Sequence, residues 1–282
     1  MSRRQQKKPR EKKAVLILVE GDSEIEALSA GLIEVVGEEK FKILFAKMDK
    51  DLAEQLARGR TLVPGRERDD SGGDMFGKDE VNEENIPDYI DDWYIKTWLQ
   101  KNSRLCIHRK HISRLYHVID MDGSYIPDDC VSYGGSSREH NLYRETGILT
   151  SRKTGSEQQR HNMAHRRKNI DAAINMDEIS CSGTKMSYRL YFFSSNLDHY
   201  IHNNANMIGN QKVSSARVFS NSYYEDPVGY SSFFGVGNME SDDWTVSWDS
   251  VRSGMNSILR GTNYGILIND LLEYKHELEQ EG

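Results

Sequence analysis

The chain has 282 residues, of which 29% are charged and 37% hydrophobic, and its formal net charge is −7. This is the composition of a soluble globular protein with one large domain or two small ones. Its longest apolar stretch, residues 14–19, is too short to cross a bilayer or to form the core of a signal peptide. We therefore expect a cytoplasmic protein that does not enter the membrane.

The charge is unevenly distributed. Residues 2–13 carry +6, which leaves −13 on the rest of the chain. This basic arm either contacts phosphates or an acidic partner, or is a solvated, flexible tail. An acidic body disfavours non-specific coating of nucleic acid but is compatible with a metal site, because a bound cation reverses the local field. The three cysteines form no CxxC pair and predict neither a zinc site nor a disulfide framework (Cys106, Cys130 and Cys181).

The first predicted element is a strand at 14–19, whose continuous apolar residues fit a parallel sheet covered on both faces. A helix should follow, capped by Asp22 or Ser23 with Glu26 completing a capping box. Its apolar residues recur at helical spacing (Ile25, Leu28, Leu32 and Val35 or Val36). Residues 41–46 predict a second strand, and this order of elements opens an α/β fold.

Residues 59–92 differ in composition from the segments around them. They are rich in Gly, Asp, Glu, Arg and Asn and include Pro64 and Pro87. We predict a surface insertion, mobile or partner-binding, with few apolar contacts to the sheet. A helical pattern resumes at 90–98, and residues 115–119 predict a third strand.

The second half of the chain is less regular. Residues 124–155 are polar and glycine-bearing, which predicts a loop, and 157–176 predict a basic helix. A strand at 188–193 and a helix at 197–208 should follow. From about residue 210 the chain is rich in Ser, Asn, Tyr and Gly and gives no clear assignment before two predicted terminal helices (251–259 and 266–278).

Two acidic motifs each follow directly after a predicted strand. VEGDSE contains Glu20, and VIDMDG contains Asp120 and Asp122. Open α/β sheets bind ligands beyond the carboxyl ends of their strands, so all three carboxylates should lie at one edge. Asp120 and Asp122 are two residues apart and would point the same way in an extended segment. Carboxylate oxygens arranged in this way suit Mg²⁺.

A Glu-Gly after the first strand and a DxD after a later one resemble the Toprim family, which includes topoisomerases, bacterial primases and OLD-type nucleases. The resemblance covers roughly residues 14–123 and 188–193 and implies a Toprim-like parallel sheet flanked by helices. It implies that Mg²⁺ or Mn²⁺ is the cofactor. It also implies that Glu20, Asp120 and Asp122 are catalytic and bind the metal, with Glu24 as a further metal ligand. The long spacing between the motifs departs from a minimal Toprim domain, and the 59–92 insertion would explain it.

Within that family the chain is most similar to RloB-like and DUF4435-like, OLD-related phage-defence nucleases. The resemblance implies a Mg²⁺-dependent endonuclease that hydrolyses RNA such as tRNA, or DNA, as the toxic effector of an antiphage, abortive-infection system. It also implies an ABC-type or AAA ATPase partner, since the chain itself has no GxxxxGK[ST] loop. The expected organisation is a tail at 1–13, a catalytic domain at 14–200 and a helical or irregular extension at 201–282.

Other interpretations stay open. The chain could be a non-catalytic Toprim-like scaffold that docks on an ATPase, or a nucleotidyl transferase related to primases, and it could form a homodimer. The basic helix could contact phosphates of a nucleic acid, or simply be solvated (Arg160, His165, Arg166, Arg167 and Lys168). Aromatic residues between 223 and 234 could stack on bases, although packing is their commoner use.

Overall fold

The computed structural model describes residues 13–47, 75–78, 81–135, 137, 140–151, 154–235 and 241–281. Its centre is a five-stranded sheet with strand order β2-β1-β3-β8-β7. Four of these strands are parallel, and β7 pairs antiparallel with β8 at one edge. The strands are β1 (Lys13–Val19), β2 (Phe41–Lys47), β3 (Ile112–Asp120), β7 (Glu178–Cys181) and β8 (Thr184–Phe193). The chain therefore has the α/β architecture expected from its sequence.

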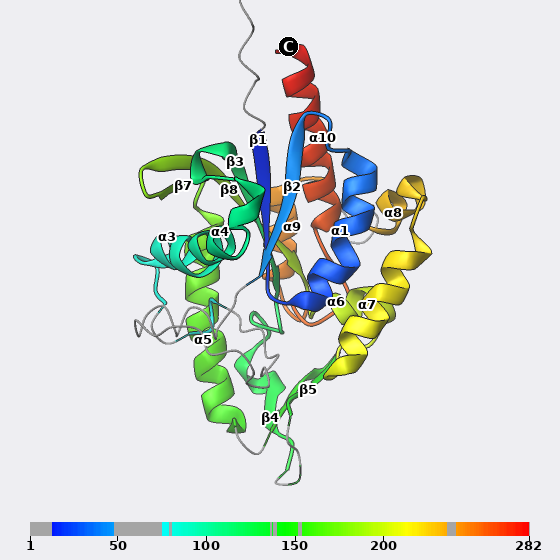
Figure 1. Ribbon diagram of the computed structural model, residues 1–282. Helices are drawn as coiled ribbons and strands as arrows, with labels where there is room; N and C mark the ends of the chain where they lie inside the picture. Colours follow the sequence, from blue (N-terminus) through cyan, green and yellow to red (C-terminus); the bar gives the residue numbers. More distant parts are fainter. Residues whose placement is uncertain are drawn as a thin grey trace, which may run out of the picture.

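Helices cover both faces of the sheet (Figure 1). Because side chains alternate along a strand, Val15 and Ile17 of β1 face one hydrophobic core and Leu16 and Leu18 face the other. The first core is closed by α1 (Asp22–Val36), α6 (Leu197–His202), α7 (Asn210–Ser222), α8 (Pro227–Phe233) and α10 (Tyr264–Gln280). The second is closed by α3 (Ile86–Tyr89), the π-helical stretch η1 (Ile90–Lys96), α4 (Thr97–Lys101), α5 (Gly155–Ile174) and α9 (Trp244–Val251).

The strand order reverses at β1. The chain passes from β1 through α1 to β2 on one side, and then returns to place β3 on the other side of β1. At such a point the connections leave the sheet in opposite directions and open a crevice at the carboxyl ends of the two strands. Leu18 pairs with His117, so β1 and β3 end at nearly the same level. This crevice is where Glu20 and Asp120 emerge.

A small three-stranded sheet lies beyond the carboxyl ends of the central strands (Figure 1). Its order is β4-β6-β5, with β4 (Val131–Tyr133), β5 (Leu142–Arg144) and β6 (Gly147–Thr150). The predicted loop at 124–155 is therefore wrong, because its few apolar residues form a local core with Met163 and Ile258. Short 3₁₀ turns complete the fold: η2 (Ser103–Leu105), η3 (Arg109–His111) and η4 (Asp128–Cys130).

The start of α1 differs from the predicted capping box. Gly21 occupies the N-cap position, and no side chain caps the helix. Ser23 instead directs its hydroxyl to the carboxylate of Glu24, with both oxygens at 3.2 Å. The first turn of α1 therefore contains the buried carboxylate of Glu24 in place of the predicted capping box.

The described part of the predicted insertion packs against the sheet. Met75, Phe76, Val81, Ile86 and Ile90 are each at most 1% exposed and belong to the second core. The prediction of few apolar contacts is therefore wrong for this part. Its apolar residues are widely spaced between charged ones in the sequence, yet they are buried in the fold. Residues 59–74 and 79–80 lie outside the described residues.

Residues 201–281 share the core of the sheet. Phe219 of α7, Tyr230 of α8 and Leu267 of α10 are buried in the first core together with β1. Helix α9 ends at Val251, so the helix predicted at 251–259 is wrong, whereas α10 confirms the last predicted helix. Within the described residues, no helix is long and apolar enough to cross a membrane.

Candidate carboxylate site at the sheet edge

The three carboxylates predicted from the sequence meet at the crevice between β1 and β3. Glu20 directly follows β1, and its Oε1 accepts a hydrogen bond of 3.2 Å from the backbone N–H of Asp120, the last residue of β3. Asp122 has a left-handed backbone, with φ of 49°, and its N–H donates to the carbonyl of Ser195 at 2.8 Å. The DxD segment therefore turns at Asp122 and is not extended as predicted.

Arg166 joins the three residues. It comes from α5 and is only 6% exposed. Its guanidinium lies 3.0 Å from Asp122 Oδ2 through Nη1 and 3.2 Å from Glu20 Oε1 through Nη2, and Nη2 also donates to the carbonyl of Asp120. The residue expected on a basic surface is instead a buried counter-ion between the carboxylates. We call Glu20, Asp120, Asp122 and Arg166 the carboxylate site.

A second buried acidic group adjoins this site on the other side of Asp120. Asp198, in the first turn of α6, pairs through Oδ2 with Lys212 Nζ of α7 at 3.0 Å. Its Oδ1 is buried and has no hydrogen-bond partner among the residues that the structure describes. Glu24 is also buried, and Asp120 Oδ1 accepts a hydrogen bond of 3.0 Å from the backbone N–H of Leu197. We call Glu24, Asp198 and Lys212 the second acid set.

Burial and mutual repulsion dominate the electrostatics. Burial raises the pKa of Asp120 well above its ordinary value, and the charges of Glu20, Glu24 and Asp122 raise it further. The pKa of Glu24 is raised by burial, an effect that Lys212 opposes and Asp198 reinforces. Burial alone would lower the pKa of Lys212, but the carboxylates of Asp198 and Asp120 raise it above its ordinary value.

The site carries an excess of negative charge. When ionised, the five carboxylates of the carboxylate site and the second acid set exceed the charges of Arg166 and Lys212 by three. Carboxylate oxygens are ligands for hard divalent cations. Within the residues that the structure describes, however, no group of three or more His, Cys, Asp or Glu side chains is arranged to hold a metal ion. Arg166 supplies the positive charge between Glu20 and Asp122.

Four other basic residues of α5 also have partners within the chain. Arg160 donates to the carbonyls of Asp128 and Val131, and Arg167 pairs with Asp128 at 3.0 Å. Lys168 pairs with Glu83 at 2.9 Å, and His165 Nε2 lies 2.9 Å from the carbonyl of Lys78. These four side chains are at the surface or partly buried, in contrast to Arg166.

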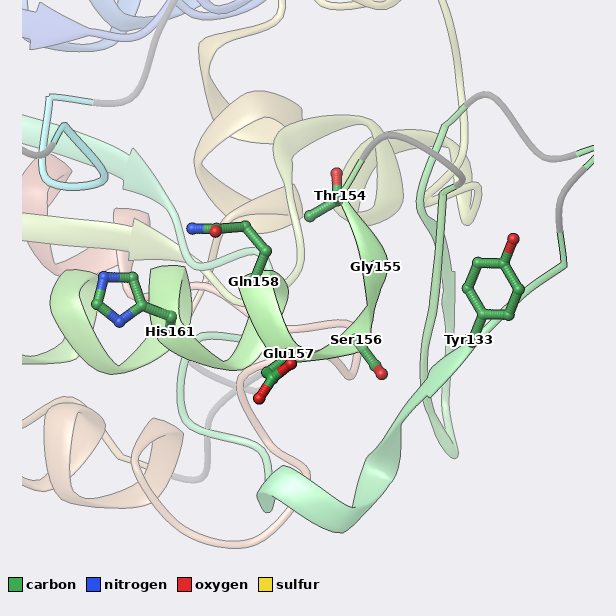
Figure 2. A pocket seen from close by; sticks show the side chains of 7 residues that line it. All are labelled: Tyr133, Thr154, Gly155, Ser156, Glu157, Gln158 and His161. Atoms are coloured by element: carbon green, nitrogen blue, oxygen red, sulfur yellow. The ribbon is translucent and has the colours of Figure 1, made fainter.

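Two hollows border α5. Figure 2 shows the larger one, about 550 Å³, between Tyr133 of β4 and the first turns of α5, where Glu157 and His161 lie. It contains none of the carboxylates described above. The smaller hollow, about 170 Å³, is lined by Asp122 and Arg166, by neutral polar side chains, and by Gly77 and Met163. It therefore opens directly beside the carboxylate site.

Sequence reasoning missed three residues at this edge. Asp198 comes shortly after the end of β8, and a search for acids at or just beyond the end of every apolar strand would have found it. Lys212 and Tyr143 lie in segments whose positions the sequence does not reveal. The aromatic residues after 223 mostly pack rather than remain available for bases: Tyr230 and Phe234 are 1% exposed, although Tyr224 is exposed.

A comparison of the chain with protein-family models, with curated proteins and with solved structures finds no match. The function therefore has to be argued from the geometry of the site and from the motifs that the sequence carries.

Proposed function

We propose that this protein is a Toprim-type, Mg²⁺-dependent nuclease that hydrolyses phosphodiester bonds. The observation that supports this function best is the meeting of Glu20, Asp120 and Asp122 at the point where the strand order reverses. In open α/β sheets this is the place where ligands bind. The order of the motifs, Glu-Gly after one strand and DxD after the neighbouring strand, agrees with the resemblance to the Toprim family.

The residues suit a hard divalent cation in donor type and in charge. All the acidic groups offer oxygen, the net charge is negative, and Asp198 has a buried carboxylate oxygen without a partner. Glu20, Asp120 and Asp122, with Glu24, would hold Mg²⁺ or Mn²⁺, provided that Arg166 releases a carboxylate. Such a cation, when bound, polarises a phosphate and stabilises the leaving oxygen.

The chain's own groups would share the remaining work. Glu20 would position the attacking water or take its proton, since its carboxylate is partly exposed and is held by the N–H of Asp120. Arg166, already among the carboxylates, would neutralise a phosphate oxygen that approaches Asp122. Lys212 would hold Asp198 in place.

The biological role follows from the resemblance alone. It assigns RNA such as tRNA, or DNA, as the substrate and makes the protein the effector of an antiphage system. Because the chain carries no Walker-type loop, ATP would act through an ABC-type or AAA partner.

A second candidate function is that of a non-catalytic Toprim-like scaffold that docks on an ATPase. One observation favours it: Arg166 already bridges Glu20 and Asp122, as a purely structural ion network would require. The two functions differ in one respect, namely whether the carboxylates are needed for turnover or only for folding.

The test is a cleavage assay on tRNA, single-stranded DNA and duplex DNA with Mg²⁺, with and without the co-purifying ATPase. Cleavage by the wild type that is lost in Glu20→Gln and kept in Glu34→Gln, an exposed acid of α1, supports the nuclease. Chain extension in the presence of nucleoside triphosphates would instead indicate a nucleotidyl transferase. An intact complex with the ATPase, together with no cleavage of any substrate, would support the scaffold function.

A further inference from the structure

The smaller hollow beside the carboxylate site is lined by Asp122 and Arg166, by Gly77 and Met163, and by five neutral polar residues. These five are Ser124, Asn141, Tyr143, Gln159 and Asn162. We call these five residues the amide pocket. Its volume of about 170 Å³ lies below the ~300 Å³ at which sites for drug-sized ligands begin, so it suits a single ring system better than a whole nucleotide.

The hydrogen bonds around the pocket fix the direction of one donor. The backbone N–H of Ser151 donates to Asn141 Oδ1 at 2.8 Å, so the Asn141 amide must present its nitrogen on the other side. That nitrogen donates to Gln159 Oε1 at 3.0 Å. The Gln159 oxygen is therefore engaged, and its Nε2 is left to donate to whatever enters the pocket. A backbone N–H can only donate, so this orientation does not depend on how the side-chain amides are assigned.

The other walls of the pocket are held in place. Asn206 pins Tyr143 by accepting from its N–H at 2.7 Å and donating to its carbonyl at 2.9 Å. Burial, and then the charge of Asp122, raise the pKa of the Tyr143 phenol well above its ordinary value, so it stays protonated. Gln159 itself is only 8% exposed. Tyr143 and Gln159 are thus held in place, and the five neutral polar residues suit a neutral ring such as a base, beside the charged Asp122 and Arg166 of the carboxylate site.

We propose that the amide pocket binds one unpaired base of the nucleic acid, next to the phosphate at the carboxylate site, and selects a base that offers a carbonyl oxygen to Gln159 Nε2. This inference rests on the proposed nuclease function and adds the basis of its specificity. The side-chain amides of Asn and Gln read base edges by such hydrogen bonds, and unstacked bases are the usual targets of sequence-specific RNA recognition. Guanine and uracil carry the required carbonyl, and adenine does not.

Nucleoside monophosphates test the pocket separately from cleavage. We expect guanosine and uridine 5′-monophosphates to bind about fivefold or more tightly than adenosine 5′-monophosphate, the effect of one hydrogen bond, in saturation-transfer NMR titrations. Gln159→Met keeps the length and neutrality of the side chain, and it should remove the preference. Gln159→Glu should reverse it, because an acceptor then faces the ligand. Gln211→Glu, on an exposed position of α7, should leave it unchanged.

The outcomes separate the two proposals. Equal affinity for the three monophosphates, or a preference that survives in folded Gln159→Met, overturns the base pocket even if the protein cleaves nucleic acid. If the protein cleaves no nucleic acid but shows a base preference that depends on Gln159, the base pocket is supported and the nuclease function is ruled out. Melting curves of both Gln159 variants establish that they fold, and Gln159→Met remains informative if Gln159→Glu does not fold.

Discussion

Arg166 determines the electrostatic state of the carboxylate site. It is nearly inaccessible to solvent and contacts Glu20, the carbonyl of Asp120 and Asp122. Removing one partner of a buried ion pair is costly, because the other charge is left without compensation. Arg166 therefore stabilises the cation-free protein and, in our account, competes with Mg²⁺ for the same oxygens.

Replacement of Arg166 tests this competition. Arg166→Gln should lower the free energy of unfolding in EDTA by about 3–5 kcal/mol. Added Mg²⁺ should then raise the melting temperature of the variant more than that of the wild type. Thermal melts over a Mg²⁺ titration measure both effects. Arg167→Gln, whose partner Asp128 is exposed, should change little. A Mg²⁺ response equal to that of the wild type would show that Arg166 does not compete with the cation.

His117 predicts a loss of stability in acid. It is 1% exposed, its Nδ1 lies 3.0 Å from the Tyr188 hydroxyl, and burial, assisted by the charge of Arg166, lowers its pKa to about 3. At pH values below the unfolded-state pKa of about 6.5, His117 is protonated in the unfolded chain but stays neutral in the folded protein. Stability should therefore fall as pH drops from about 6.5 toward 3, by up to about 1.4 kcal/mol per pH unit.

Urea unfolding at several pH values between 7.5 and 4 measures this slope. His117→Gln should lose that part of the pH dependence, whereas His108→Gln, at the exposed position before η3, should keep it. An identical pH profile for wild type and His117→Gln would contradict the assignment.

At the residue level, the sequence predicted Glu20, Asp120 and Asp122 because each follows an apolar strand and the rule for sheet edges then brings them together. It did not predict the role of Arg166, since the pattern of α5 marks it as one cation among several on a polar helix. The burial of Arg166 depends on the small sheet and on residues 75–78. Both contact α5 although they are distant from it in sequence.

At the level of elements, the parallel strands β1, β2, β3 and β8 were predictable because their long apolar runs leave little choice of structure. The three short strands of the small sheet were not, since each has only three or four residues and gains stability from Met163 and Ile258. Local pattern is a weak guide where tertiary contacts decide.

Helix α5 has an inner and an outer side, and its cations should behave differently. Arg167→Ala and Lys168→Ala remove surface charges, so each should weaken binding of nucleic acid and reduce the salt slope by about 1, with turnover at saturating substrate retained. Fluorescence anisotropy over a salt series gives the slopes. Unchanged affinity and slope in both variants would remove α5 from the nucleic-acid interface.

At the scale of the whole molecule, most of the described segments share two cores, one on each face of the central sheet. Residues 86–96, expected to belong partly to a surface insertion, bury Ile86, Ile90 and Ile95 beneath β1 and β3. Residues near the C-terminus close the opposite core. Composition misled the prediction here, because a segment rich in charge can still bury a few well-spaced apolar side chains.

Native-state hydrogen exchange measures this integration. Backbone amides of α3 and η1 should exchange with free energies close to those of β1 and β3, because these elements share a core and should open together. The amide of Gly254, in an exposed turn after α9, serves as the fast-exchanging reference. Exchange of 86–96 as fast as that reference would restore the interpretation as a surface insertion.

The most direct test of the central claim pairs cleavage with stability in Asp120→Asn. The substitution keeps volume and leaves an oxygen to accept from the N–H of Leu197. It also removes a carboxyl whose pKa is raised by burial and by its acidic neighbours, which means that the folded protein disfavours its charged form and should not be destabilised by its loss. We predict that Mg²⁺-dependent cleavage, assayed with any ATPase that co-purifies, falls to background while the melting temperature is unchanged or higher. Cleavage at the wild-type rate by folded Asp120→Asn would contradict the account.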